Sequence, residues 1–408
     1  MINYNEALKL VLKNVTPIGR QKIKLENSAG YVLAEDIKTK FNIPLFDNSS
    51  VDGFGVKVSD IEDSSSGLPV KLNLIGTVRA GDSAKVLVTS GTTVKILTGA
   101  IIPDSVEAVV MKEFCTEELN KVYIKKPAKK WENIRRQGEE FCKSSKVISE
   151  GKRITPPVIG LLATLGCKSF YVYKKPKVSI IVTGSELVKP GKKLLPGKIY
   201  ESNSYSLIAC LKEIGIENVS IFFAKDEKKI ITKRVKKAIS TSDVVITVGG
   251  VSVGDYDFVK EILDKLGIKT YFTKVAIKPA KPNYFGTCIK KKKKKIVFGL
   301  PGNPVSSLIS YHQLIKPALL KMMGQINISP FQAKAQLGSD LKKQTSRLEF
   351  VRGIAEQKNG DLLVEPTKGQ GSHMLGGIAS ANCLIHFPKE KDLIHKGENV
   401  DIELISWN

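Results

Sequence analysis

Residues 243–257 read DVVITVGGVSVGDYD, and this stretch decides the fold at the centre of the chain. Residues 244–248 are a short apolar, β-branched run, which is typical of a strand buried on both faces. Three glycines and two aspartates, the second of them Asp257, separate this run from a helical pattern over 258–266. A strand, a glycine-rich turn and a helix start predict either a simple tight turn or a loop whose backbone N–H groups hold a phosphate or another anion.

Strands and helices alternate around this stretch, from residue 176 to about residue 325. The strand-like segments are VSIIVTG, VSIFFAK, DVVITVGG and VFGL, and the helix-like segments are NSYSLIACLKEIG, EKKIITKRVKKAIS, DFVKEILDKLG and PVSSLISYHQLIKPALLKMMG. Such alternation predicts a three-layer α/β domain with a mostly parallel sheet wrapped by helices. Ligands of these sheets bind at the carboxyl ends of the strands, which is where the glycine loop falls.

The sequence pattern of the rest of the chain is different. Short β-branched segments such as VKLNLIG, AKVLVTSG, TVKILTG and AVVMKEF predict a β-rich lobe, and similar segments near the C-terminus predict a small β-barrel-like domain. Residues 154–165 predict a helix that begins after Thr155 with Pro156 in its first turn. We therefore predict an α/β and β multidomain chain with four parts: a discontinuous helical linker domain (1–43 and 141–175), a β-rich lobe (44–140), an α/β domain (176–325) and a C-terminal β domain (326–408).

The net charge of +24 raises the question of a nucleic-acid partner. The lysines are spread along the whole chain, aromatic residues make up only 7% of it, and basic and aromatic residues do not interleave, which argues against specific nucleic-acid binding. The longest basic run, 290–295, lies between two apolar segments and predicts the tip of a hairpin. A basic surface would still help to collect an anionic substrate.

Several classes of protein are disfavoured by what the sequence lacks. No apolar run approaches the roughly 20 residues that cross a bilayer, and the N-terminus has no signal-peptide pattern, so no membrane association is expected. The six cysteines form no CxxC pair, which suits a reducing cytoplasm. The four histidines have no ligand spacing, which argues against a histidine-centred metal site or Ser–His catalysis.

Acidic residues follow three strands of the predicted parallel sheet. Glu186 follows VSIIVTG, Asp226 follows VSIFFAK, and Asp255 and Asp257 follow the glycine loop. Carboxylates that face a phosphate-binding loop predict a metal-assisted phosphoryl or nucleotidyl site, because carboxylates alone would repel the phosphate. The alternative is that Glu186 caps a helix and Asp226 is simply solvated.

Three further motifs carry candidate site residues. In LPGNPVSSL, Pro304 suits the first turn of a helix, and Ser306 can donate to a ligand or cap that helix. In AIKPAKP, prolines stiffen a loop that presents Lys278 and Lys281 to an oxyanion, unless this is a solvated basic turn. In FDNSSVDGFG, Asp52 is either an acid facing a metal or substrate, or a turn residue.

These motifs, in their order along the whole chain, resemble the molybdopterin molybdenumtransferases, called MoeA in bacteria and similar to the E domain of gephyrin. The motifs that carry the resemblance are IPLFDNSSVDGFGV, RAGD, ILTGAIIPDSVEAVVMKE, NIRRQGEE, VTGSEL, YESNSYSL, GGVSVGDYDF, AIKPAKP, LPGNPVSS, EFVRG and GQGSHML. The resemblance implies an enzyme that inserts molybdate into adenylylated molybdopterin and releases AMP with the help of Mg²⁺ or a similar ion.

The resemblance also assigns roles residue by residue. It implies catalytic roles for Asp52, Thr98, Glu186, Asp226 and Asp257, and a metal site formed by Glu186, Asp226 and Asp257. The molybdopterin and its phosphates would lie on Gly249, Gly250, Ser252, Gly254, Pro301, Gly302, Asn303, Pro304 and Ser306. Molybdate would lie on Lys278, Lys281, Pro282, Arg352 and Ser372. A homodimer is implied, which would explain how the lobe's Asp52 and Thr98 reach the site, as is contact with molybdopterin adenylyltransferase and molybdoenzymes.

The chain departs from the usual family motifs in three places. It has VDGFG where the family usually has MDGYA, and GEE, ending at Glu140, where the family has GED. It has TGSEL where the family has TGDEL, so Ser185 removes one possible metal ligand, and the sequence leaves open whether Asp255 replaces it. Two other readings remain: a molybdopterin adenylyltransferase with the same α/β domain, and a scaffold or nucleic-acid-binding protein that kept the fold without activity.

Overall fold

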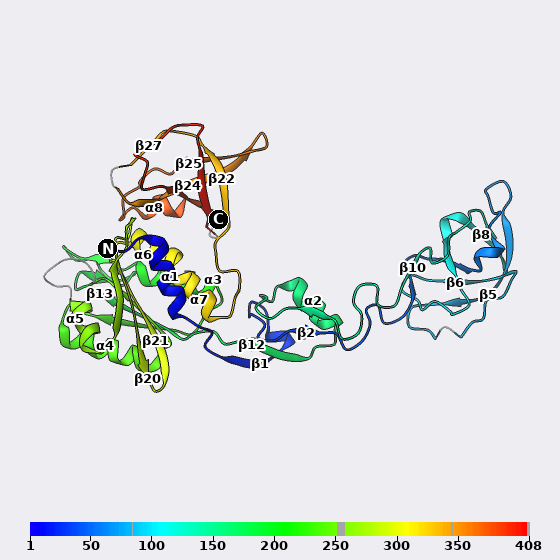
Figure 1. Cartoon of the computed structure of the whole chain (residues 1–408), viewed down its shortest axis with the longest axis horizontal. Helices are drawn as coiled ribbons and strands as arrows, with labels where there is room; N and C mark the ends of the chain where they lie inside the picture. The colour runs from blue at the N-terminus through cyan, green and yellow to red at the C-terminus, as the bar shows by residue number, and fades with distance from the viewer. Residues whose placement is uncertain (84, 251–257, 344–345, 406–408) are drawn as a thin grey trace. The chain divides into compact units, whose positions relative to one another are not determined.

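The computed structural model describes residues 1–83, 85–250, 258–343 and 346–405 (Figure 1). The chain divides into two compact units, Asp36–Glu150 and the remainder, Met1–Glu35 with Gly151–Asn408. The larger unit contains the central α/β sheet and the C-terminal barrel.

A six-stranded sheet forms the centre of the larger unit. Its order is β16 (Val219–Ala224), β13 (Val178–Thr183), β17 (Val244–Val248), β21 (Lys293–Leu300), β20 (Pro282–Lys290) and β18 (Lys269–Lys274). The first four strands are mutually parallel, and β20 runs antiparallel to its two neighbours. The predicted, mostly parallel sheet is therefore confirmed.

Helices cover both faces of this sheet and make the predicted three layers (Figure 1). One face carries α1 (Tyr4–Asn14), α3 (Asn203–Glu213), α6 (Pro304–Ser310) and α7 (Lys316–Met322), and the other carries α4 (Lys228–Thr241) and α5 (Phe258–Lys265). Side chains alternate between the layers, as a strand requires: Ile180 and Ile246 pack in the first core, whereas Ile181 and Val245 pack in the second.

The lysine run does form a hairpin tip, as predicted. Strands β20 and β21 pair antiparallel out to Lys290 and Lys293, and the two residues between them, Lys291 and Lys292, have φ angles of 50° and 61°. Two successive residues in the left-handed region make a tight two-residue turn that matches the twist of the strands.

The last helix of the α/β domain is not uniform. The sequence predicts one helix over 304–324, but a π-helical turn, η4 (Tyr311–Ile315), separates α6 from α7. Pro317 has no N–H to bond to the carbonyl of Gln313 four residues earlier, and a wider turn accommodates that missing bond. The turn buries His312, and desolvation lowers the pKa of its imidazole to about 3.

The pH dependence of stability should report this buried histidine. His312 stays neutral in the fold, while the unfolded chain binds its proton below about pH 6.5, so acid favours unfolding. We expect the free energy of unfolding to fall by about 1.4 kcal/mol per pH unit from this group as pH drops from 6.5 towards 4. Urea unfolding of the His312→Gln variant across this range should show the slope reduced by that amount. Equal slopes in the two proteins would contradict the assignment.

The C-terminal part of the larger unit is a closed barrel. Its ring contains β24 (Leu348–Lys358), β25 (Asp361–Pro366), β22 (Gln332–Leu337), β28 (Asn399–Leu404) and β26 (Cys383–Phe387). Because β24 pairs with both β25 and β26, the ring has no free edge, as the β-barrel-like prediction requires. A short strand from the α/β domain, β19 (Ile277–Lys278), adds to β24 in parallel.

The smaller unit is β-rich, as predicted. Its sheet has the order β7 (Ala108–Met111), β4 (Gly53–Val56), β6 (Thr92–Ile96), β5 (Val70–Val78), β9 (Lys121–Ile124) and β8 (Cys115–Glu118). The segment AKVLVTSG, predicted as a strand, forms none over residues 85–90. The Val88 N–H donates to the Ser105 hydroxyl, 17 residues further along the chain, at 2.8 Å instead of to a neighbouring strand.

The remaining short elements are mostly two-stranded pairs. In the larger unit, β1 (Arg20–Lys24) pairs with β12 (Ser169–Tyr173), and α2 (Pro156–Thr164) begins after Thr155 as predicted. In the smaller unit, β2 (Ile37–Lys38) pairs with β11 (Lys146–Ile148), and β3 (Asn48–Ser49) pairs with β10 (Ile134–Arg135). Other pairs are β14 (Leu187–Val188) with β15 (Ile199–Tyr200) and β23 (Leu341–Lys342) with β27 (Leu393–Ile394), and α8 is Leu375–Ala379. In the described residues no helix combines the length and the apolar character needed to span a bilayer.

Candidate active site

A cavity of about 1040 Å³ opens at the carboxyl ends of the parallel strands. The loops after β13, β16, β17 and β21 line one side with Glu186, Asp226, Gly249 and the Pro301–Pro304 turn. The segment that contains Lys278, Lys281 and Pro282 and the loop 370–373 of the C-terminal domain line the rest. Loops far apart in sequence meet here because parallel strands present their carboxyl ends at the same edge.

Two glycines shape the floor of the cavity after β17. Gly249 and Gly250 have φ angles of 85° and 67°, in the region that favours glycine. A Cβ atom at Gly249 would stand 2.8 Å from the carbonyl oxygen of Thr183, closer than a Cβ atom approaches another heavy atom in real structures. Any side chain here would therefore strain the backbone and push the two strand ends apart.

The two acids of the described part of the cavity come from adjacent loops. The Ser185 N–H donates to Asp226 Oδ2 at 2.8 Å, and the Asp226 N–H donates to the Ser185 hydroxyl at 3.4 Å. The Glu186 carboxylate folds back over Gly184, where an added Cβ would lie 2.7 Å from Oε1. Neither Glu186 nor Asp226 forms a salt bridge within the described residues, so both carboxylates keep oxygens for a cation.

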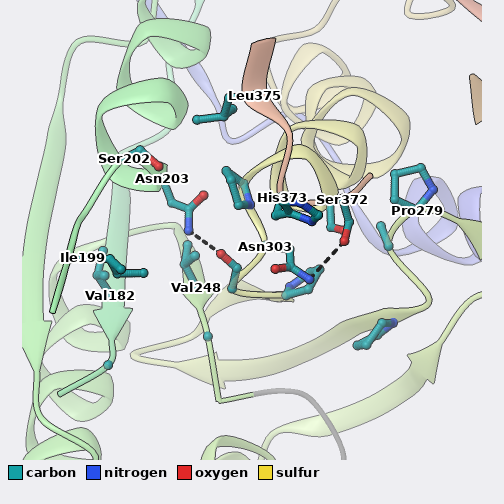
Figure 2. A pocket seen from close by; sticks show the side chains of 18 of the residues that line it. Val182, Ile199, Ser202, Asn203, Val248, Pro279, Asn303, Ser372, His373 and Leu375 are labelled. Carbon is teal, nitrogen blue, oxygen red and sulfur yellow. Dashed lines mark hydrogen bonds between the residues drawn. The ribbon is translucent and has the colours of Figure 1, made fainter. Parts of the chain in front are cut away.

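The turn after β21 is held in place by side-chain hydrogen bonds (Figure 2). Asn203 Nδ2 donates to the carbonyl of Gly302 at 2.8 Å, and Asn303 Nδ2 donates to the hydroxyl of Ser372 at 3.2 Å. The Val305 N–H donates to the Ser372 carbonyl at 3.2 Å, which ties the start of α6 to the C-terminal domain. The turn and the Ser372 loop therefore form one continuous polar wall.

The predicted lysine loop faces this wall. Lys278 Nζ lies 3.2 Å from the carboxylate of Glu349, whose side chain is only 10% exposed, and Lys281 is exposed at the cavity. Ala280 between them has a φ of 76°, and Asn283 Nδ2 donates to its carbonyl at 2.6 Å. The loop is therefore rigid. Glu349 partly neutralises the charge of Lys278, whereas Lys281 forms no salt bridge among the described residues.

Two arginines of the C-terminal domain lie differently with respect to the cavity. Arg352 is 1% exposed and donates to the carbonyls of Gly369 and Gly371 at 2.9 and 3.3 Å, so it supports the Ser372 loop from behind instead of lining the cavity. Desolvation lowers the pKa of its guanidinium to about 10. Arg347 lines the cavity and donates to the carbonyl of Ile277 at 2.8 Å.

Family comparisons cover nearly the whole chain. Residues 2–166 match the family described as MoeA N-terminal region (domain I and II), residues 179–321 match the probable molybdopterin binding domain, and residues 334–405 match the MoeA C-terminal region (domain IV). The chain is 36% identical to the molybdopterin molybdenumtransferase of Haemophilus influenzae over 99% of this chain and 98% of that protein. The chain belongs to the molybdopterin molybdenumtransferase (MoeA) family.

Other relatives agree with this membership. The chain is 34% identical to the molybdopterin molybdenumtransferase of Staphylococcus epidermidis, over 100% of this chain and 96% of that protein. The crystal structure of the molybdopterin biosynthesis moeA protein from Pyrococcus horikoshii matches with a TM-score of 0.83 and 33% identity, covering 99% of this chain and all of that one. The resemblance seen in the sequence is confirmed, and with it a transferase family of molybdenum cofactor biosynthesis.

The MoeA motif residues Asp52 and Thr98 lie in the smaller unit and contact each other. Asp52 Oδ1 accepts both the N–H of Thr98 at 2.9 Å and its hydroxyl at 2.8 Å, and Lys112 Nζ lies 3.6 Å from Oδ2. The bond from the Thr98 N–H, then that from its hydroxyl, lowers the pKa of the Asp52 carboxyl. The Asp52 carboxylate is therefore ionised and held in a fixed orientation by Thr98.

The Asp52 carboxyl offers a direct check of this pair. The Thr98→Val variant keeps the shape and the N–H but loses the hydroxyl donor, so we expect the pKa of Asp52 to rise towards its ordinary value while remaining below it. Carbon-detected NMR titration of the carboxyl groups would measure the shift. A Thr98→Ser control should leave the pKa low, and an unchanged pKa in Thr98→Val would contradict the hydroxyl's role.

Part of the predicted glycine loop lies outside the described residues. Ser252, Gly254, Asp255 and Asp257 lie outside the described residues. Within the residues that are described, no three acidic, histidine or cysteine side chains lie close enough together to hold a metal ion. Glu140, the GEE departure, is exposed in the smaller unit.

The sequence reading missed further cavity residues. They are Tyr200, Ser202, Asn203, Arg347, Gln370 and His373. All but Arg347 fall inside motifs that carry the MoeA resemblance, YESNSYSL and GQGSHML, so the motif boundaries were the available signal. Gln370 also shapes the wall, because its Oε1 accepts the Arg352 N–H and its Nε2 donates to the Arg352 carbonyl.

Proposed function

We propose that this chain transfers molybdenum from molybdate to adenylylated molybdopterin and releases AMP. The observation that carries the proposal is the cavity itself, in which a backbone-lined anion cradle and a rigid lysine loop face each other. Two anionic substrates must meet in such a reaction, and a single cavity with two different anion-binding walls suits that requirement.

The two walls take different parts of the reactants. The glycine loop that starts with Gly249 and Gly250 and includes Ser252 and Gly254, and the turn Pro301, Gly302, Asn303 and Pro304 with Ser306, would hold the pterin and its phosphates. Lys278, Lys281 and Pro282, together with Ser372, would hold molybdate. Arg352 would act from behind the wall, by keeping the Ser372 loop in place.

A divalent cation such as Mg²⁺ fits the donor set of the cavity. Mg²⁺ is held in proteins by one or two carboxylates together with substrate phosphates. Glu186 and Asp226 supply two carboxylates at the cavity wall that form no salt bridge among the described residues. We include Asp257 as the third acid. When bound, the ion would neutralise the phosphate charge of the substrate, and the protein residues would hold that substrate in line with molybdate.

We further propose a homodimer in which Asp52 and Thr98 of one subunit complete the cavity of the other. Mixing Asp52→Asn and Glu186→Gln proteins, each inactive alone, tests this by subunit exchange. Random pairing would make about half of the dimers heterodimers, and each heterodimer would contain one intact site and one inactive site. About a quarter of wild-type activity should therefore return. No recovery after exchange verified by native mass spectrometry would contradict the shared site.

The broader setting is part of the same proposal. We also propose the four-part domain division and a cytoplasmic location. We propose contact with molybdopterin adenylyltransferase and molybdoenzymes, because the substrate and the product would pass between proteins of one biosynthetic pathway. None of these is needed for the chemistry of the cavity.

One assay tests the function. Purified protein receives adenylylated molybdopterin, molybdate and Mg²⁺, and AMP release is followed; release that depends on molybdate is the expected result. Transfer of AMP from ATP to molybdopterin would instead identify an adenylyltransferase, and no turnover would identify a scaffold. We expect Asp257→Ala to abolish turnover while circular dichroism shows an intact fold, and wild-type rates in that variant would contradict the metal site.

A further inference from the structure

A second cavity, of about 610 Å³, lies at the opposite, amino-terminal edge of the central sheet. Its lining includes Asp243 and Ile296 at or near the starts of β17 and β21, and Lys177 just before β13. A strand of five residues such as β17 rises about 3.3 Å per residue, so this cavity lies roughly 16 Å from the candidate active site. The two cavities can therefore be filled independently.

The lining of this amino-edge cavity is strongly basic. Among the described residues it contains eight lysines: Lys174, Lys175 and Lys177 before β13, Lys290 and Lys291 at the hairpin tip, and Lys293–Lys295 at the start of β21. Lys295 pairs with Asp243 at 3.2 Å, the one carboxylate of the described lining. The other lysines form no salt bridge within the part of the chain that the structure describes.

The carbonyl ends of nearby helices do not neutralise the positive charge of these lysines. Helices α1, α4 and α7 end at the cavity, at Asn14, Thr241 and Met322, and the carbonyl end of a helix carries about −0.5 charge. Three such ends and Asp243 still leave a surplus of roughly five positive charges. Mutual repulsion of these ammonium groups costs stability, and an anion in the cavity would remove that cost.

The side chains indicate which anion fits. The lining offers lysine ammonium groups, whereas its Asn14, Ser240 and Thr241 side chains already donate to helix carbonyls. Its described residues include no aromatic ring on which a base could stack. The lysines converge in one hollow instead of following a stripe along the surface, which suits a compact ligand better than a nucleic-acid backbone. We propose that this cavity is a second anion site that binds a linear di- or triphosphate, either free or as the tail of a nucleotide.

Isothermal titration with inorganic tripolyphosphate at low salt tests the site. The variant Lys177→Gln/Lys290→Gln/Lys293→Gln removes three charges from the cavity, and the control Lys334→Gln/Lys342→Gln/Lys396→Gln removes three exposed lysines from the C-terminal domain. We expect about tenfold weaker binding in the cavity variant. We expect the control to bind as the wild type does. Equal weakening in both would show that net charge alone attracts the ligand, and would overturn the proposal.

Further arms separate the alternatives. All titrations are repeated in a Lys278→Gln/Lys281→Gln background, so that the candidate active site cannot supply the signal, and the difference between the two triple variants should persist there. ATP and tripolyphosphate binding alike, with adenosine not binding, would show recognition of the phosphates alone. Tighter, lysine-dependent binding of a DNA duplex or of a poly-glutamate peptide would overturn the proposal in favour of a macromolecular partner. Thermal melting of each variant verifies the fold.

Discussion

Replacing Lys278 and Lys281 together by glutamine is expected to lower kcat/KM for molybdate about a hundredfold, with most of the effect in KM. Both ammonium groups line the candidate active site, and a hydrogen bond to a charged group contributes about 1.5–3 kcal/mol. The two losses do not add fully, because Glu349 already screens Lys278 at 3.2 Å. We therefore expect the single Lys281→Gln variant to carry the larger share.

The experiment has a matched control in the same segment. Lys274→Gln removes another exposed charge a few residues earlier, outside the cavity lining, and should change kcat/KM less than twofold. AMP release is measured against molybdate concentration at fixed adenylylated molybdopterin. Equal effects of Lys274→Gln and Lys281→Gln would show that the lysines act through bulk charge, and would remove the molybdate role from this loop.

Arg352→Met is expected to lower the free energy of unfolding by about 3 kcal/mol, the second large effect. The substitution leaves the carbonyls of Gly369 and Gly371 without their donor and removes a side chain that is 99% buried, its exposed fraction being 1%. Urea unfolding followed by intrinsic fluorescence measures the change. Arg347→Met, at the cavity wall, should cost much less stability because that side chain is half-buried.

The same variant decides between two roles for Arg352. If Arg352 supports the Ser372 loop from behind, KM for molybdate should rise less than about tenfold and in step with the loss of stability. If it contacts molybdate directly, KM should rise about a hundredfold while the free energy of unfolding stays near that of the wild type. The second outcome would contradict the position of the guanidinium seen here.

Local patterns were sufficient for most of the fold. The run 244–248 predicted a strand buried on both faces, and the lysine run predicted a hairpin tip, because burial and turn formation depend on neighbouring residues. The strand predicted in AKVLVTSG was wrong, because its Val88 N–H bonds to Ser105, 17 residues further along the chain. The π-helical turn at Tyr311–Ile315 was also beyond a periodicity argument, which treats Pro317 only as a possible helix break.

The candidate site depended more on contacts between distant segments. Strand ends placed Glu186, Asp226 and Gly249 at one edge, since parallel topology alone brings them together. The pairing of Lys278 with Glu349 joins residues 71 positions apart, and no spacing rule predicts it. The burial of Arg352 behind the Ser372 loop has the same origin, since a strand's alternation tells which residues share a face, but not which face meets the cavity.

Strand β19 has a consequence for how this protein can vary. Ile277 and Lys278 of the α/β domain pair with Leu348 and Glu349 of the barrel. The position of the lysine loop therefore depends on both domains. A barrel transplanted from another member of the family would lack its partner strand unless residues 276–282 travelled with it. The loop and the barrel should therefore be exchanged together between members of the family. Recombination that separates them should yield folded proteins with an incomplete cavity.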